Sequence, residues 1–391
     1  MATKTYAHTS AVSWRGVTPL FLGHLVNDGF GSFFAPLLPL LIHRLDLSLA
    51  MAGAFGTLRI LISSITQPGL GYLLDRAQRP ILAVVGPVLT IFAMGFIGKV
   101  GGLWQLAIVL IAGGLGTALF HPANASLVAA TGGENRGLAM AFFSAGGTLG
   151  GAIAPLIIVP YVDAVGLDGT PWLIIPALAV VALIAASINR NTGFYRLTSP
   201  PAKERFSLRG LPSGLALLWI VIVFRSLTGT SFWNFLAVLI TERGASTLIG
   251  GVGISVFALS GALGGVIGGT LSDRIGPKRV IFGSLILACP FLLLFLHGPA
   301  ELSLVFLGLA GFFLFSSTPV GIVAAQRLLP GKVGLVSGLV MGFAWGVGGL
   351  ALTPIGWLAD RYGLAAVMTG VAFLPIVGAA VVLFYRECNV N

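Results

Sequence analysis

The hydrophobic pattern of this chain consists of long apolar runs separated by short polar breaks. About 20 consecutive apolar residues are enough for a helix to cross a lipid bilayer. Runs of that length fall at 17–42, 50–74, 80–98, 103–129, 137–162, 171–189, 214–240, 246–272, 279–297, 302–326, 333–359 and 364–385. They predict an all-α membrane protein with twelve transmembrane helices, and they leave no stretch for a soluble domain.

The composition agrees with a membrane protein. Hydrophobic residues make up 56% of the chain and charged residues 9%, whereas about 25% of a soluble domain is charged. The net charge of +10 is small and does not indicate a nucleic-acid partner. The stretch from Met1 to Arg15 has no apolar core, so we expect no signal peptide. Cys289 and Cys388 indicate neither a disulfide nor a metal site.

The longest polar connection, Arg190 to Ser213, divides the apolar runs into two sets of six. It contains five basic residues and Pro200-Pro201. We therefore predict an N-terminal six-helix bundle over residues 1–189, a cytoplasmic linker over 190–213, and a C-terminal six-helix bundle over 214–391.

The distribution of Lys and Arg predicts the orientation, because cytoplasmic loops of membrane proteins carry an excess of both. With both termini in the cytoplasm, that side receives sixteen basic residues and the other side four, namely Arg44, Lys99, Arg243 and Arg361. We expect a multi-pass protein of the cytoplasmic membrane with both termini inside the cell.

A short loop motif occurs twice, half a chain apart. Gly71-Tyr72-Leu73-Leu74-Asp75-Arg76-Ala77-Gln78-Arg79 returns as Gly269-Thr270-Leu271-Ser272-Asp273-Arg274, so that the two Asp-Arg pairs lie 198 residues apart. A weaker third copy, Gly356-Trp357-Leu358-Ala359-Asp360-Arg361, follows a later apolar run. Repetition at this spacing indicates one structural unit written twice.

The motif Gly-x-Leu-x-Asp-Arg after the second and eighth predicted helices resembles the loop signature of the major facilitator superfamily of transporters. The resemblance implies two pseudo-symmetric six-helix bundles with alternating access to a central site, in a protein that we expect to be a monomer. It also implies that the loop residues control the conformational cycle. These residues are Gly71, Asp75, Arg76, Arg79, Gly269, Asp273 and Arg274.

Three ionisable residues other than histidine fall inside predicted spans: Asp28, Arg59 and Arg225. Such groups cost at least a few kcal/mol in lipid and normally face a wet cavity or a partner. His24, Asn27 and Asp28 share one helix face at i, i+3 and i+4. We interpret His24 and Asp28 as a proton relay with Asn27 beside it, and the alternative is a buried polar cluster that only ties helices together.

A second polar position is Phe120-His121-Pro122-Ala123-Asn124 in the fourth predicted helix. Pro122 leaves a backbone carbonyl without its donor one turn earlier and can kink the helix. His121 is either an ordinary core histidine or part of a cavity wall that takes part in proton transfer. We include Asn27 and Asn124 among the candidate substrate contacts.

The two arginines are candidate ligands for an anionic substrate. Arg59 and Asp28 differ in predicted depth by about one helical turn, ~5–6 Å, so an Asp28–Arg59 pair with no substrate role is one alternative. Arg225 has no acid at comparable depth in its half of the chain, so it pairs with Asp28, binds an anion or snorkels toward the cytoplasm. Trp233 and Asn234 lie further along the same helix and could contact a ligand.

Together, His24-x-x-Asn27-Asp28, Gln67-Pro68, and Phe120-His121-Pro122 followed by Arg136-Gly137-Leu138-Ala139 resemble the fosmidomycin-resistance group of efflux transporters. That resemblance implies proton-driven export of a small compound, anions included. The group tends to carry an acid after the His-Pro pair, where this chain has Ala123 and Asn124. Proton transfer then falls to Asp28 and His121, or the coupling differs.

Other classes of function find no support in the sequence. It contains no Gly-x-Ser-x-Gly, no paired metal-ligand motif and no phosphate-binding loop of the Walker type, so we expect neither an enzyme nor a bound cofactor or metal. The partners we expect are a small-molecule substrate, protons and the lipid bilayer. The main alternative to export is a proton-linked importer of an organic anion, a carboxylate, phosphate or phosphonate, held by Arg59 and Arg225.

Overall fold

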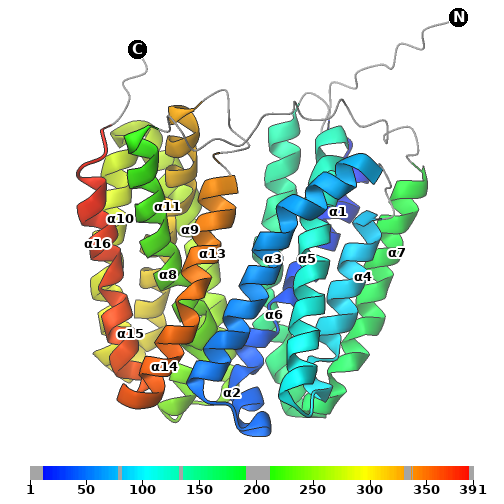
Figure 1. Ribbon diagram of the computed structural model, residues 1–391, viewed down its shortest axis with the longest axis horizontal. Coiled ribbons are helices and arrows are strands. Elements are labelled where there is room, and N and C mark those ends of the chain that lie inside the picture. The colour runs from blue at the N-terminus through cyan, green and yellow to red at the C-terminus, as the bar shows by residue number, and fades with distance from the viewer. Residues whose placement is uncertain are drawn as a thin grey trace, which may run out of the picture.

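The computed structural model of the chain is built from helices (Figure 1). It describes residues 12–77, 82–131, 135–190, 212–329, 336 and 338–386. The predicted linker lies outside these residues except for Arg190, Pro212 and Ser213.

Six membrane crossings come from the first half of the chain. They are formed by α1 with α2 (Trp14–Gly31, Phe34–Leu45), α3 (Leu49–Ala77), α4 with η1 (Leu82–Gly95, Ile97–Lys99), α5 (Leu103–Thr131), α6 (Arg136–Val165), and η2 with α7 (Leu167–Leu173, Ile174–Arg190).

Six more come from the second half. They are formed by α8 (Ser213–Glu242), α9 (Thr247–Ile275), α10 (Pro277–His297), η4 with α11 (Ala300–Leu302, Ser303–Leu328), the π-helical segment η6 with α13 and α14 (Gly338–Phe343, Ala344–Leu350, Leu352–Tyr362), and α15 with α16 (Leu364–Ala372, Leu374–Val382).

The twelve predicted spans each coincide with one of these crossings, which confirms the predicted fold class. Within the described residues, ten helical segments are long and apolar enough to cross a membrane. The crossing at Ala83–Lys99 is shorter. The one at 338–362 is divided by a turn at Ala351, so neither of its pieces is long enough by itself.

The first crossing is interrupted halfway, at Ser32 and Phe33. Pro36, one turn later, has no N–H to donate to the carbonyl of Ser32, so the regular hydrogen-bond ladder cannot continue through this point. Ser32 instead donates both its backbone N–H and its hydroxyl to the carbonyl of Asp28, at 3.0 and 2.7 Å. The break therefore places irregular backbone next to the one acid predicted inside a span.

The helices of each half pack mainly against one another and form two bundles (Figure 1). Between the bundles, α3 contacts α13 and α14, α6 contacts α9, and α2 contacts α8. Helix α16 and the end of α7 that precedes the predicted linker are on the side of the molecule opposite to α2 and α14 in Figure 1, and α16 is followed there by the last described residues. We call the end that carries α2 and α14 the distal face, and the other the terminal face.

At the distal face the two bundles approach each other backbone to backbone. A Cβ atom added at Gly53 of α3 would lie 2.1 Å from the carbonyl oxygen of Leu352. One added at Gly356 of α14 would lie 2.1 Å from the carbonyl oxygen of Leu49. Only glycine permits helices to pack this closely. The bundles are therefore closed against each other at the distal face.

Glycine has the same role inside the C-terminal bundle, where α9 and α11 form its most extensive packing. A Cβ at Gly264 would lie 2.0 Å from the carbonyl oxygen of Phe312, a backbone atom that cannot rotate away. We predict that Gly264→Ala destabilises the bundle by about 1–3 kcal/mol, the usual cost of overpacking a well-packed core. The melting temperature of the purified protein in detergent would report this change.

Gly283→Ala in α10 is the matched control, because a Cβ there meets no atom within 4 Å. That substitution should be neutral or slightly stabilising, since alanine is favoured over glycine inside a helix. Equal melting temperatures for the two variants would contradict the packing argument.

Candidate functional site

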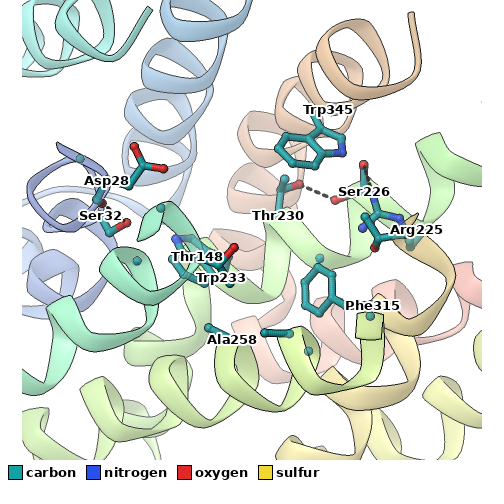
Figure 2. A pocket seen from close by; sticks show the side chains of 18 of the residues that line it. Asp28, Ser32, Thr148, Arg225, Ser226, Thr230, Trp233, Ala258, Phe315 and Trp345 are labelled. Carbon is teal, nitrogen blue, oxygen red and sulfur yellow. Dashed lines mark hydrogen bonds between the residues drawn. The ribbon is translucent and has the colours of Figure 1, made fainter. Parts of the chain in front are cut away.

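A cavity of about 530 Å³ lies between the two bundles. Its walls come from α1, α3, α5 and α6 on one side and from α8, α9, α11 and α13 on the other. Figure 2 shows Asp28 and Ser32 on one wall and Arg225, Ser226, Phe315 and Trp345 across the opening from them. The ionisable residues predicted inside spans, Asp28, Arg59 and Arg225, all line this one cavity.

Asp28 is the centre of a polar cluster on the N-terminal side. Its Oδ2 lies 3.2 Å from His24 Nε2, and its Oδ1 lies 3.5 Å from His121 Nε2. Asn27 donates its side-chain amide to Oδ1 at 2.9 Å. The structure thus brings together the three residues predicted to carry protons. Of these three, Asp28 is the one that lines the cavity.

The hydrogen bond of His24 Nδ1 determines where protons can reside. That nitrogen lies 2.8 Å from the carbonyl oxygen of Phe143 in α6. A carbonyl oxygen can only accept, so Nδ1 carries a hydrogen, and in a neutral ring Nε2 is then a bare acceptor. A bare Nε2 and an ionised carboxylate would repel each other at 3.2 Å. The contact with Asp28 therefore holds one shared proton, either on the imidazole or on the carboxyl group.

The same three side chains have donor atoms that all lie within 4.8 Å of one another, close enough to surround a metal ion. In this structure the two oxygens of Asp28 contact His24, His121 and Asn27.

Arg59 of α3 does not pair directly with Asp28. Its Nη1 donates to the carbonyl of Gly31 at 3.2 Å, at the break between α1 and α2. Its Nε is buried and has no hydrogen-bond partner. Among the residues that the structure describes, no ion pair within 4.0 Å links Arg59 to Asp28. The alternative of a simple Asp28–Arg59 salt bridge is therefore not what the structure contains.

Arg225 of α8 lies in the wall opposite Asp28 (Figure 2). It is 4% exposed. Its Nη2 donates to Ser226 Oγ at 3.0 Å, and its guanidinium carbon lies 5.9 Å from the centre of the Phe315 ring. Its Nε has no partner, and no acid within ion-pair distance belongs to the described part of the chain. An arginine so deeply buried without a counter-ion lacks the charge that would compensate its burial.

Three predicted contact residues lie away from the cavity. Asn27 is fully buried against Asp28. Asn124 donates to the carbonyls of Ala83 and Phe120, each at 3.1 Å, and so bonds to helix backbone. Asn234 is buried near Gly56, where an added Cβ would lie 2.4 Å from its Oδ1. Trp233 does line the cavity, as predicted.

Other residues line the cavity that were not predicted from the sequence. Phe315 and Trp345 give the C-terminal wall an aromatic surface beside Arg225, and Thr148 and Thr230 add hydroxyl groups (Figure 2). None of them stands out in an apolar helix, where aromatic and hydroxyl residues are common. Gly147 of α6 also borders the cavity.

The predicted gating residues are only partly described. Gly71, Asp75 and Arg76 belong to α3, but their side chains lie outside the described residues, as does all of Arg79. In the second copy, a Cβ atom added at Gly269 would meet no atom within 4 Å. Asp273 lies 4.0 Å from Arg327 of α11, and Arg274 is exposed. The role of these residues in the conformational cycle stays a prediction.

Comparison with known proteins identifies the relatives of this chain. The family model described as the Major Facilitator Superfamily matches residues 20–227 and again 218–389. The fosmidomycin resistance protein of Escherichia coli (strain K12) is 29% identical over 365 residues, covering 91% of this chain and 89% of that protein. The MFS-type transporter YfnC of Bacillus subtilis (strain 168) is 31% identical, with the same coverage. Both resemblances stated from the motifs are thereby confirmed.

Solved transporter structures share the fold at low sequence identity. A bacterial homolog of the human lysosomal transporter Spinster, in an inward-facing and occupied conformation, superposes with a TM-score of 0.70 at 16% identity, covering 94% of this chain and 96% of that one. The nucleoside transporter NupG superposes with a TM-score of 0.72 at 15% identity, covering 95% and 100%. These likenesses establish the fold and carry no information about the substrate.

The proton-sharing contact depends on the absence of a side chain at Gly147. A Cβ there would lie 2.3 Å from His24 Nε2 and 2.7 Å from Asp28 Oδ2, so Gly147→Ala must push the two groups apart. We predict that this variant folds but loses at least ten-fold in the rate of transport measured in proteoliposomes.

Gly151→Ala is the matched control, one turn away on the same wall. Its Cβ would meet Ser32 Oγ at 3.3 Å and Trp233 at 3.6 Å, so only a small adjustment is needed. If both variants lost transport equally, the space around the His24–Asp28 pair would not be the cause.

Proposed function

Because this chain belongs to the major facilitator superfamily, and is therefore a membrane transporter rather than an enzyme, we propose that it moves a small anionic compound across the membrane with protons as the driving ion. The observation that carries the proposal is the pair of charges across the cavity: Arg225 buried without a counter-ion, opposite Asp28 and its shared proton. A bound anion supplies the charge that Arg225 lacks.

The anion would bind at the C-terminal wall of the cavity. Arg225 lines the cavity there, and the aromatic residues Phe315 and Trp345 line it as well. Arg59 lies in the other wall, where it already donates to the carbonyl oxygen of Gly31 and is attracted electrostatically by the carboxylate of Asp28. We therefore assign substrate binding chiefly to Arg225, with the apolar part of the compound resting against the two aromatic residues.

The proton would be carried by Asp28 and His24, with His121 as the third member. Proton transfer between the carboxyl oxygen and Nε2 needs no movement of either side chain, because Phe143 and Asn27 hold both groups in place. Asp28 also faces the cavity, so water entering from either side of the membrane can load or unload it.

The orientation follows from the basic residues. Because the sequence predicts sixteen of them on the side of the termini and four on the other, we place both termini in the cytoplasm and the chain in the cytoplasmic membrane. The closed distal face is then the outer one, and the described conformation faces inward.

For direction, we propose export in exchange for protons. Relatives named for fosmidomycin resistance and for multidrug resistance support that choice. Uptake with protons remains the second candidate for a specific reason. An anion at Arg225 and a proton at Asp28 attract each other across the cavity, which favours carrying both in the same step.

The role of Asp28 can be tested directly. We predict that Asp28→Asn abolishes substrate accumulation driven by an imposed pH gradient but spares exchange of labelled substrate without a gradient, because exchange requires no change in protonation. Proteoliposomes with gradients of either sign, tested on a panel of organic anions, would measure both activities and the direction of flux.

Asp46→Asn serves as the control for Asp28→Asn. Asp46 lies outside the cavity with a φ of 51°, a left-handed conformation that asparagine also tolerates. Full gradient-driven transport by Asp28→Asn would refute proton carriage by this residue. Loss of both accumulation and exchange would instead assign Asp28 a purely structural role.

The role of Arg225 predicts a selective effect on charged substrates. Charge-assisted hydrogen bonds contribute about 1.5–3 kcal/mol, so Arg225→Gln should raise KM for an anionic substrate roughly ten- to hundred-fold. Its neutral amide or ester analogue should be affected little, and Arg225→Lys should fall between. An equal loss for the acid and its neutral analogue would show that Arg225 supports the fold rather than the substrate.

A further inference from the structure

The third copy of the repeated motif lies at the distal face and has no part in the function proposed so far. It ends α14 with Asp360-Arg361. The carboxylate of Asp360 reaches across to the other bundle, where Oδ1 accepts from the backbone N–H of Leu49 at 2.7 Å and Oδ2 accepts from that of Ala50 at 2.9 Å. Leu49 is the first residue of α3. An acid of the C-terminal bundle therefore caps a helix of the N-terminal bundle.

The contact uses two interactions that reinforce each other. The first N–H groups of a helix have no partner within it, and a carboxylate that accepts from them is also favoured by the positive end of the helix dipole. Ser48 accepts from Met51 and covers a third donor. Arg361 does not compete for the carboxylate, because its guanidinium carbon lies 3.9 Å from the centre of the Trp357 ring.

The contact between α6 and α9, which also joins the two bundles, repeats this arrangement in weaker form. Helix α9 starts at Thr247, 198 residues after the start of α3, the same offset that separates the two loop motifs. Thr247 donates its hydroxyl to Asp163 of α6 at 3.2 Å, and the backbone donor of Ile249 is met by Ser246 of its own chain segment. In both contacts, an acid at the distal end of one bundle accepts a hydrogen bond from the first residue of a helix in the other bundle. The one at Asp360 engages two backbone donors.

Helix α14 also has room to leave this contact. Residues 352, 353, 356 and 360 face α3, as their contacts with Gly53, Thr57 and Leu49 show. At 100° per residue, the opposite face carries 351, 354, 355, 358 and 362. Those five residues line a second, apolar cavity of about 500 Å³ between α14, α8 and α15. The turn at Ala351, which separates α14 from α13, lies at the end of α14 that is farther from Asp360.

We infer that Asp360 is a positioning residue of the transport cycle: its cap on α3 holds the distal face closed, and the cap must be released before the cavity can open on that side. Substituting such a capping residue by alanine changes an equilibrium roughly five-fold. Loss of the cap should therefore shift the protein toward conformations open at the distal face. This inference rests on the proposed alternating-access function and does not depend on which ion drives it.

The test uses one reporter cysteine in the cavity. Ala258 lines the cavity and makes no polar contact in the described structure, so Ala258→Cys is placed in a background with Cys289→Ala and Cys388→Ser. A membrane-impermeant maleimide is then applied from the distal face or from the terminal face of oriented vesicles. Asp360→Ala should raise the rate of distal labelling about five-fold and lower terminal labelling. Asp360→Asn, which retains one acceptor, should fall between, and Asp360→Glu should restore part of the parent pattern.

Asp168→Asn is the matched control, since Asp168 is an exposed acid paired within its own bundle to Arg44 at 2.9 Å. It should leave both labelling rates unchanged. Unchanged rates in Asp360→Ala, or a parallel rise from both faces as in a loosened fold, would overturn the inference, as would an equal effect of Asp168→Asn.

Failure of the proposed function would look different. Asp360→Ala could change the labelling rates from the two faces in opposite directions while transport does not depend on the pH gradient. That result would support the role of the cap and reject proton coupling. A parent protein labelled at Ala258→Cys equally from both faces would reject alternating access itself.

Discussion

The structure depends on one constraint: an ionisable side chain inside a bilayer must have either a partner or water. Three such side chains, Asp28, Arg59 and Arg225, enter spans of this chain, and the fold meets the constraint by bringing all three to one cavity between the bundles. Asp28 is held by two histidines and an amide. Arg225 is left with a neighbouring hydroxyl and a ring face. The carboxylate on one wall therefore has partners and the guanidinium of Arg225 on the other has no acid beside it among the described residues, and this difference is the reason for proposing the second wall as the binding surface.

The sequence indicated much of this arrangement because helix periodicity is readable without a structure. Spacing at i and i+4 placed His24 beside Asp28, and depth along the spans placed Arg59 within about one helical turn of Asp28. The directions in which side chains point from other helices were not readable. Asn124 donates to the carbonyl of Ala83 on α4 and to that of Phe120 in its own helix, and Asn234 lies against Gly56 of α3. Phe315 and Trp345 line the cavity only because α11 and α13 both pass beside Arg225, and the sequence does not show this arrangement.

The positions at which helices break could not be predicted from the sequence either. Pro36 stops the first crossing, yet Pro87, Pro122, Pro155 and Pro290 all lie inside continuous helices. A proline frees a backbone carbonyl in every case, and whether the helix ends depends on what else can satisfy that group. At the first crossing the hydroxyl of Ser32 and the guanidinium of Arg59 donate to the carbonyls of Asp28 and Gly31, in the last turn of α1 before the break. The irregular backbone is thus stabilised by the same residues that border the cavity.

The packing of α1 against α6 decides how proton and substrate can communicate. A Cβ at Gly146 would lie 2.5 Å from the carbonyl oxygen of Phe21, and one at Gly150 would lie 2.1 Å from that of Leu25. In the proposed cycle, helices this close would move as one body, so the bond from His24 to Phe143 and the contact with Asp28 would persist when the bundles rock. Arg225 belongs to the other bundle. Rocking would then change the access of water to Asp28 and the distance between the two charges, and the proposed coupling would act through the electric field across the cavity.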